Sequence, residues 1–313
     1  MTASTPLPDD ARIDPARAHA LPASAPEPWP LDIVDATGST NADLAAHLKT
    51  LPRTRAALPR PIVRVAYEQT AGRGRQGRPW FALPGNALLC SVGCVLPRPV
   101  DALAGLSLAV GVALAEGLGT LPLRGQRVRL KWPNDLLLTD RDTPLGKLGG
   151  ILVETVWNTA DATAIVIGFG INVRGAEAVA AEVDALRARD AALAGALPPA
   201  ALSAACPSAN LTDTLAAVLD PLATALEHFS AAGLAPFRQR WAALHAHAGR
   251  EVVLLEQGRE VARGIAIGID ETGQLLLDTP DGERAIAAGD ISLRASGEVG
   301  AVGHGGIGGE VAP

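Results

Sequence analysis

Three glycines alternate with three arginines between Gly72 and Arg78, and Pro79 and Trp80 follow them directly. Glycine lets backbone approach a ligand closely, and the arginine guanidinium is a planar cation that suits phosphate and carboxylate groups. A segment this dense in both residue types predicts a loop that closes over an anion. The mostly apolar run at residues 62–67 predicts a strand that delivers this loop.

The same segment fits the pattern G-x-G-x-x-G of dinucleotide-binding sites, but that pattern requires a helix to open at the third glycine. Pro79 and Pro84 follow the glycines here and exclude such a helix. The sequence contains no G-x-x-x-x-G-K-[ST], which excludes a P-loop. An arginine–glycine segment that binds nucleic acid normally lies in a basic chain, whereas this chain has a net charge of −6.

The 313 residues are enough for two domains. No apolar run approaches the ~20 residues of a membrane span, and no signal segment opens the sequence, so we expect no membrane association. Cys90, Cys94 and Cys206 form no C-x-x-C pair. Their number and spacing indicate buried free thiols in a cytoplasmic protein rather than disulfides or a zinc site.

The order of apolar segments predicts an α+β fold. Residues 1–30, rich in proline and alanine, predict a disordered lead without room for a helix-turn-helix, so we expect no DNA binding. Residues 31–247 alternate strands in a meander with amphipathic helices and predict a mixed or antiparallel sheet. Five short strands within residues 248–296 predict a small barrel, and the glycine-rich residues 297–313 predict a disordered tail.

Three further polar clusters lie at the ends of predicted strands. The residues from Lys131 to Asp135 read K-W-P-N-D, Lys147 heads an apolar strand, and Asn172 ends a strand that contains two glycines. Taken singly, these clusters are equally well explained as a polar turn, a solvated lysine and a bulge. Together with the loop they supply cations, amides, an indole and glycines, which suits a nucleotide and a carboxylate as ligands.

These motifs resemble those of the biotin protein ligases (biotin–[acetyl-CoA-carboxylase] ligases), and they occur in the same order. The matching segments are GRGRQGRPW at 72–80, KWPND at 131–135, KLGGILVE at 147–154, GFGIN at 168–172 and Ser39-Thr40-Asn41. The resemblance covers about residues 31–296, and it is to the monofunctional form without an N-terminal DNA-binding domain. It implies a mixed β-sheet flanked by helices, of the class II aminoacyl-tRNA synthetase-like kind, with a small C-terminal SH3-like β-barrel.

The resemblance also implies a two-step reaction. Biotin and ATP, with Mg²⁺, give biotinyl-AMP and pyrophosphate, and a lysine of a biotin carboxyl carrier protein domain then accepts the biotin. The partner would be acetyl-CoA carboxylase or a related carboxylase, and a homodimer is an open alternative to a monomer. Two other functions stay open: a lipoate–protein ligase of related fold, and a nucleotide-binding regulator without transfer.

The site residues follow from the resemblance, position by position. It implies that the catalytic residues are Arg75, Lys131 and Lys147. The residues implied to bind biotin are Ser39, Thr40, Asn41, Gln69, Gly72, Arg73, Gly74, Arg75 and Lys147. The residues implied to bind ATP are Arg75, Arg78, Trp80, Lys131, Asn134, Lys147 and Asn172. Asp135 is expected to contact either the metal ion or the attacking amine.

Overall fold

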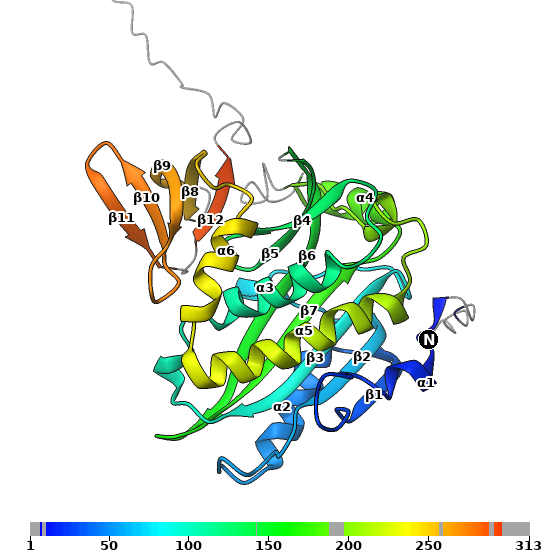
Figure 1. Ribbon diagram of the computed structural model, residues 1–313. Coiled ribbons are helices and arrows are strands. Elements are labelled where there is room, and N and C mark those ends of the chain that lie inside the picture. Colours follow the sequence, from blue (N-terminus) through cyan, green and yellow to red (C-terminus); the bar gives the residue numbers. More distant parts are fainter. Residues whose placement is uncertain are drawn as a thin grey trace, which may run out of the picture.

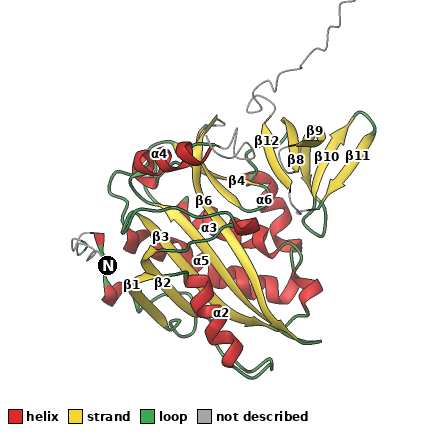
Figure 2. Cartoon of the chain, turned by 180° about the vertical axis from the view of Figure 1, so that it is seen from behind, coloured by secondary structure: helices red, strands yellow, loops and turns green. Residues whose placement is uncertain are grey.

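The computed structural model describes residue 7 and residues 11–141, 143–187, 197–256, 259–287 and 291–295. Within these ranges the chain forms a seven-stranded sheet with helices on both faces, and a separate five-stranded sheet beside it (Figures 1 and 2). The predicted α+β class, with a mixed sheet and a small C-terminal β-unit, is confirmed. The predicted tail at residues 297–313 lies outside the described residues.

The large sheet has the spatial order β1-β2-β3-β7-β6-β5-β4. Its strands are β1 (Leu31–Thr37), β2 (Ile62–Gln69), β3 (Ala87–Leu96), β4 (Gln126–Lys131), β5 (Asp135–Asp140), β6 (Thr143–Asn158) and β7 (Thr163–Asn172). β1 pairs with β2 in parallel, and all other neighbours are antiparallel. The parallel pair arises because a helix connects β1 to β2, whereas short turns join β4 through β7.

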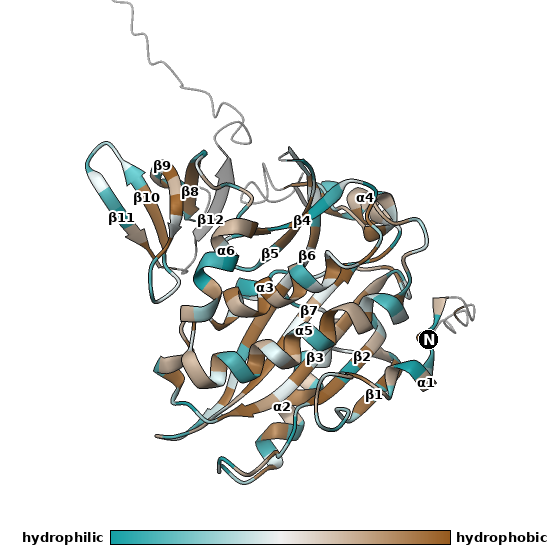
Figure 3. Cartoon of the chain, in the orientation of Figure 1, coloured by the Kyte–Doolittle hydropathy of each residue, from teal (hydrophilic) through white to brown (hydrophobic). Residues whose placement is uncertain are grey.

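Six helices accompany the strands within the described residues. They are α1 (Pro15–Ala18), α2 (Thr40–Thr50), α3 (Leu106–Leu118), α4 (Ala176–Arg187), α5 (Leu211–Ala232) and α6 (Arg238–Leu244). Helices α3 and α5 cover one face of the large sheet, and α2 lies on the other (Figures 1 and 2). The alternation along β7 explains this arrangement. Ile165 and Ile167 join the core under α3 and α5, while Ala164 and Val166 pack with α2. The strands in the middle of the large sheet are accordingly mostly hydrophobic (Figure 3).

Helix α3 lies in the core. Residues 100–118 are long and apolar enough to cross a membrane, which the sequence analysis did not anticipate, but most of α3 is buried between the sheet and α5. A glycine allows α3 to pack closely against α5, because a Cβ atom at Gly117 would lie 2.0 Å from the backbone oxygen of Ala217. The helix begins at Leu106, directly after Gly105, which adopts a φ of 79°.

The prediction of a disordered lead is wrong for residues 11–30. This segment packs beside α5: Ile13 and Trp29 are buried, and the Asp14 backbone N–H donates to Thr212 Oγ1 at 2.9 Å. An ion pair joins Arg17 to Asp213 at 2.7 Å. Composition without periodicity misled the prediction, because a few irregularly spaced apolar residues are enough to dock a short segment on an existing core.

The smaller sheet has the order β11-β10-β9-β8-β12 and is antiparallel throughout. Its strands are β8 (Glu251–Glu256), β9 (Arg259–Ile269), β10 (Leu275–Thr279), β11 (Gly282–Ile286) and β12 (Ile291–Ala295). The turn between β9 and β10 contacts the large domain, where the buried indole Nε1 of Trp132 donates to the backbone oxygen of Gly273 at 3.1 Å. The K-W-P-N-D segment is thereby joined to the C-terminal unit.

Acid should destabilise the junction between the two units through His245. This side chain is 5% exposed, stacks on Trp241 with ring centroids 4.4 Å apart, and burial lowers its pKa from 6.5 to about 3. Between these two pH values the unfolded chain binds a proton that the folded chain does not, so stability falls as pH falls through this window. The expected loss is about 2 kcal/mol at about pH 5 relative to neutral pH.

Urea unfolding at about pH 7.5 and about pH 5 measures this loss. In His245→Phe, which keeps the ring stack, the free energy of unfolding should depend less on pH by that amount. His228→Gln changes an exposed histidine of α5 and serves as the control. Equal pH dependence in His245→Phe and the unmodified chain would contradict the argument.

Candidate active site

A cavity of about 420 Å³ lies between the glycine–arginine loop and the face of the large sheet. Fourteen of the predicted site residues line it: Ser39, Thr40, Asn41, Gln69, Arg73, Gly74, Arg75, Arg78, Trp80, Lys131, Asn134, Asp135, Lys147 and Asn172. Gly72 does not line the cavity. It lies behind the lining, where a Cβ atom would be 2.8 Å from the Trp80 backbone oxygen and 3.1 Å from Gln69 Nε2.

The glycine–arginine loop folds back on itself as a tight hairpin. Trp80 N donates to Gly72 O at 2.9 Å, and Gly74 N donates to Arg78 O at 2.7 Å. At its tip, Gln76 and Gly77 have φ values of 59° and 69°. The left-handed backbone explains the third glycine of the motif. No helix follows the loop, in agreement with the exclusion of a dinucleotide-binding site.

Two glycines of β7 make room for the site on the face that α2 covers. Gly168 and Gly170 follow Val166 on this face, so the apolar surface ends there. A Cβ atom at Gly170 would lie 2.5 Å from the indole of Trp80. The Trp80 ring therefore rests directly on the backbone of β7, and its buried Nε1 makes no hydrogen bond with the described residues.

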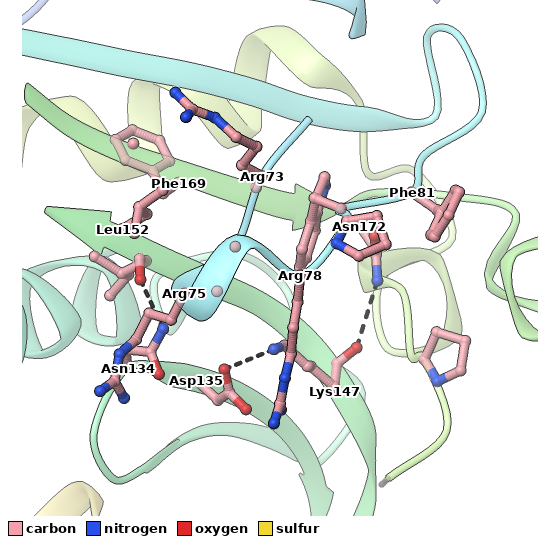
Figure 4. A pocket seen from close by; sticks show the side chains of 18 of the residues that line it. Arg73, Arg75, Arg78, Phe81, Asn134, Asp135, Lys147, Leu152, Phe169 and Asn172 are labelled. Carbon is pink, nitrogen blue, oxygen red and sulfur yellow. Dashed lines mark hydrogen bonds and ion pairs between the residues drawn. The ribbon is translucent and has the colours of Figure 1, made fainter. Parts of the chain in front are cut away.

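Lys147, from β6, is the best-placed cation at the cavity. Its Nζ forms an ion pair with Asp135 Oδ1 of β5 at 2.6 Å and lies 5.7 Å from the centroid of the Trp80 ring. Figure 4 shows Arg78 extending from the loop toward this pair, and Arg75 extending from the loop toward Asn134. Lys131 lines the same cavity and is only 6% exposed. With Arg73, five cationic side chains among the described residues line this cavity, and together they predict a strongly anionic ligand.

Asn134 and Asn172 use their amide groups to hold backbone. Asn134 Nδ2 donates to Ile151 O at 2.7 Å, and Ile151 N donates back to Asn134 O at 2.9 Å. Asn172 Nδ2 donates to Ala200 O at 3.0 Å and is 3.4 Å from Lys147 O. Both residues line the cavity, but their amide N–H groups donate to the backbone and help to position β6, the strand that carries Lys147.

At the end away from Lys147, uncharged polar side chains line the cavity around Gln69, with Arg73 and its counter-charge Glu154 beside them. Ser39 caps α2, and Thr40 and Asn41 in its first turn are buried. Gln69, at the end of β2, accepts hydrogen bonds at its Oε1 from Thr40 N at 2.8 Å and from Thr40 Oγ1 at 3.0 Å. This end therefore suits an uncharged ligand group that both donates and accepts hydrogen bonds.

Sequence reasoning missed an apolar wall of the cavity. Val179 and Val183 of α4 line it together with Leu197 and Phe81. The signal was present as a valine pair at spacing i, i+4, which places both side chains on one face of a helix. The surrounding alanines hid it, because they made α4 look only weakly amphipathic.

The cysteines take no part in nucleophilic chemistry at this site. All three are free and buried, as predicted. Cys90 lines the cavity, but burial raises the pKa of its thiol far above the ordinary value. A protonated, enclosed thiol is not a nucleophile.

Comparison with known proteins connects this geometry to a family. Residues 47–172 match the model of the biotin/lipoate A/B protein ligase family, and residues 247–294 match that of the biotin protein ligase C terminal domain. The biotin–[acetyl-CoA-carboxylase] ligase of Paracoccus denitrificans is 34% identical, over 72% of this chain and 88% of that protein. The chain belongs to the biotin protein ligase family.

Two other matches describe how this biotin protein ligase family member relates to known proteins. The bifunctional ligase/repressor BirA of Escherichia coli is 39% identical over 74% of this chain, and the match spans 66% of BirA's own length. The solved structure of the biotin protein ligase from Aquifex aeolicus, in complex with biotin and ATP, has a TM-score of 0.66 and 25% identity. The structural match covers 85% of this chain and 99% of the Aquifex aeolicus chain.

Proposed function

We propose that this chain activates biotin with ATP to biotinyl-AMP and transfers the biotin to a lysine of a biotin carboxyl carrier protein domain. One observation carries the proposal: a single cavity joins a cationic end, around Lys147, to an uncharged hydrogen-bonding end, around Gln69. The cationic end suits ATP phosphates and a carboxylate, and the uncharged end suits the ureido ring of biotin. The matched C-terminal domain model, which is specific to biotin ligases, favours biotin over lipoate.

The first step joins two anions. A carboxylate oxygen of biotin attacks the α-phosphorus of ATP, and the bond to pyrophosphate breaks. Lys147 lies where it can contact both reacting groups, and Arg75, Arg78 and Lys131 offset the charge on the phosphates. Trp80 offers an indole face to the adenine. In the second step the carrier amine attacks the acyl carbon, AMP leaves, and the nitrogen loses a proton.

Magnesium accompanies ATP in this proposal. Among the described residues that line the cavity, Asp135 is the one that carries a carboxylate. This fits Mg²⁺, which nucleotide sites usually hold with one or two carboxylates and the substrate phosphates. The described residues contain no group of three or more His, Cys, Asp or Glu side chains that would bind a metal by themselves. Asp135 also holds Lys147, so Mg²⁺ at Asp135 would release this lysine toward the substrates.

The names of the relatives and the free thiols support a proposed partner and compartment. Relatives named biotin–[acetyl-CoA-carboxylase] ligases point to a biotin carboxyl carrier domain as the acceptor. We place the reaction in the cytoplasm, because the three cysteines are free.

Pyrophosphate release tests the proposal most directly. With ATP and Mg²⁺, we expect release on addition of biotin and none on addition of lipoate. Added carrier domain should become biotinylated in the same mixture. Release with lipoate would indicate a lipoate ligase. Retention of ATP without release, with either acid, would indicate a nucleotide-binding regulator.

A further inference from the structure

A line of polar groups, buried at Thr40, Asn41 and Ser91 and half-buried at its two ends, runs along the uncharged part of the cavity. Glu154 Oε2, on β6, accepts from Asn41 Nδ2 at 2.6 Å, and Asn41 Oδ1 lies 2.6 Å from Ser91 Oγ on β3. Ser91 Oγ is 2.7 Å from Thr40 Oγ1, which contacts Gln69 Oε1. We call Glu154, Asn41, Ser91, Thr40 and Gln69 the polar network. Glu154 and Ser91 do not line the cavity, whereas the other three residues do.

Unambiguous groups fix the direction of this network at both ends. A carboxylate only accepts hydrogen bonds, so Glu154, at 2.6 Å, requires the Nδ2 of Asn41 to face it, and the more distant Leu152 backbone oxygen, at 3.4 Å, favours the same orientation. A backbone N–H only donates, so Thr40 N requires the Oε1 of Gln69 to face it. As a result Asn41 turns its oxygen toward Ser91, and the Nε2 of Gln69 remains as the donor for a ligand.

The network has one hydrogen-bond donor fewer than it has oxygen–oxygen contacts. Three contacts join Asn41 Oδ1, Ser91 Oγ, Thr40 Oγ1 and Gln69 Oε1 in a row, at 2.6, 2.7 and 3.0 Å. Both amide oxygens lack hydrogen, so only the two hydroxyl protons serve the three contacts. A ligand N–H that donates to Asn41 Oδ1 would free the Ser91 hydroxyl proton for Thr40 Oγ1, so that both amide oxygens accept and both hydroxyls donate. A cyclic urea carries such N–H groups beside a carbonyl that can accept from Gln69, whereas a dithiolane ring carries neither.

We infer that Glu154 is a positioning residue that selects a ureido ligand by fixing the amide orientation of Asn41. The inference rests on the proposed function. The Glu154 side chain is 34% exposed, and Arg73 lies 3.9 Å away as a counter-charge, so a carboxylate is well tolerated at this position. Gly168 supports the same arrangement, because a Cβ atom at that position would lie 2.1 Å from Asn41 Oδ1.

Glu154→Gln tests this inference because it changes a hydrogen-bonding pattern at almost constant shape. The new amide can donate to Asn41, which can then rotate and donate its own N–H to Ser91. The network would satisfy its contacts internally and lose its preference for a ligand N–H. We expect the KM for biotin to rise about tenfold or more, as for a lost buried hydrogen bond, and kcat and the KM for ATP to change little. Desthiobiotin, which keeps the ureido ring, should show the same fold-change.

A compensating variant separates positioning from a merely structural role. In Glu154→Gln with Asn41→Asp, the donor and the carboxylate exchange places, so an acceptor-only oxygen faces Ser91 again and the net charge is unchanged. This double variant should recover most of the affinity for biotin. Such recovery would support the positioning role of Glu154 even if the single variant folds poorly. Glu68→Gln is the matched control, because Glu68 precedes Gln69 on β2 and points to the opposite side of the strand.

Three results would overturn the inference: an unchanged KM for biotin in Glu154→Gln, an equal rise in the KM for ATP, or a KM for biotin in the double variant no lower than in the single one. Failure of the proposed function looks different. In that case the unmodified chain itself shows no biotin-dependent release of pyrophosphate.

Discussion

Lys147→Ala is expected to lower the rate of biotin-dependent pyrophosphate release on the order of 10³-fold, as for loss of a main electrostatic contact in a transition state. The reason is the electrostatic repulsion between the two negatively charged substrates. A carboxylate and a phosphate must approach each other, and Lys147 Nζ lies between Asp135, at 2.6 Å, and the ring of Trp80, with its centroid at 5.7 Å. No other lysine on β6 can replace it, since Lys147 is the only lysine in that strand.

The measurement is single-turnover formation of biotinyl-AMP, with biotin binding followed separately. Lys49→Ala removes an exposed lysine at the end of α2 and should leave the rate unchanged. If Lys147→Ala lost biotin binding but kept the rate of the chemical step at saturating biotin, the lysine would be a binding group only. Loss of rate with retained thermal stability supports the electrostatic role.

The Lys147–Asp135 pair also shows where prediction from sequence ends. The motifs could be recognised because their chemistry requires particular residue types close together along the chain: glycines for a hairpin, arginines and lysines for anions. The pairing of Lys147 with Asp135 could not, because it depends on the register between β5 and β6, which has two irregularities in this stretch. Asp135 therefore looked like a contact for metal or amine, and its ion pair with the lysine was not foreseen.

The residues behind the cavity were hidden for a related reason. Ser91 lies within an apolar strand and Glu154 at the end of an apolar motif, and neither position differs in sequence from an ordinary core or surface residue. Their roles appear only when β3, β6 and α2 bring them to Asn41. The docking of residues 11–30 was missed likewise, because it rests on contacts with α5 that are nearly 200 positions away in sequence.

Gly170→Ala should weaken ATP binding strongly, although it adds only one methyl group. The new Cβ would lie 2.5, 2.7 and 2.7 Å from three atoms of the Trp80 indole, closer than real Cβ contacts allow. β7 is buried in the middle of the sheet and cannot retreat, so the indole must move and take the glycine–arginine loop with it. We expect the KM for ATP to rise about 5- to 150-fold, the range that corresponds to losing an aromatic stack on a base.

Gly150→Ala is a closely matched control for this prediction. Gly150 lies opposite Gly170 in the register of β6 and β7, and its Cβ would lie 3.5 Å from both Trp80 Cζ3 and Lys147 Nζ, an ordinary contact distance. The same substitution on the neighbouring strand should therefore have little effect on ATP. Equal effects at both positions would contradict the prediction, because only the methyl group at Gly170 would overlap the indole. A large effect confined to Gly170 would mean that the indole must rest on bare backbone to receive the nucleotide.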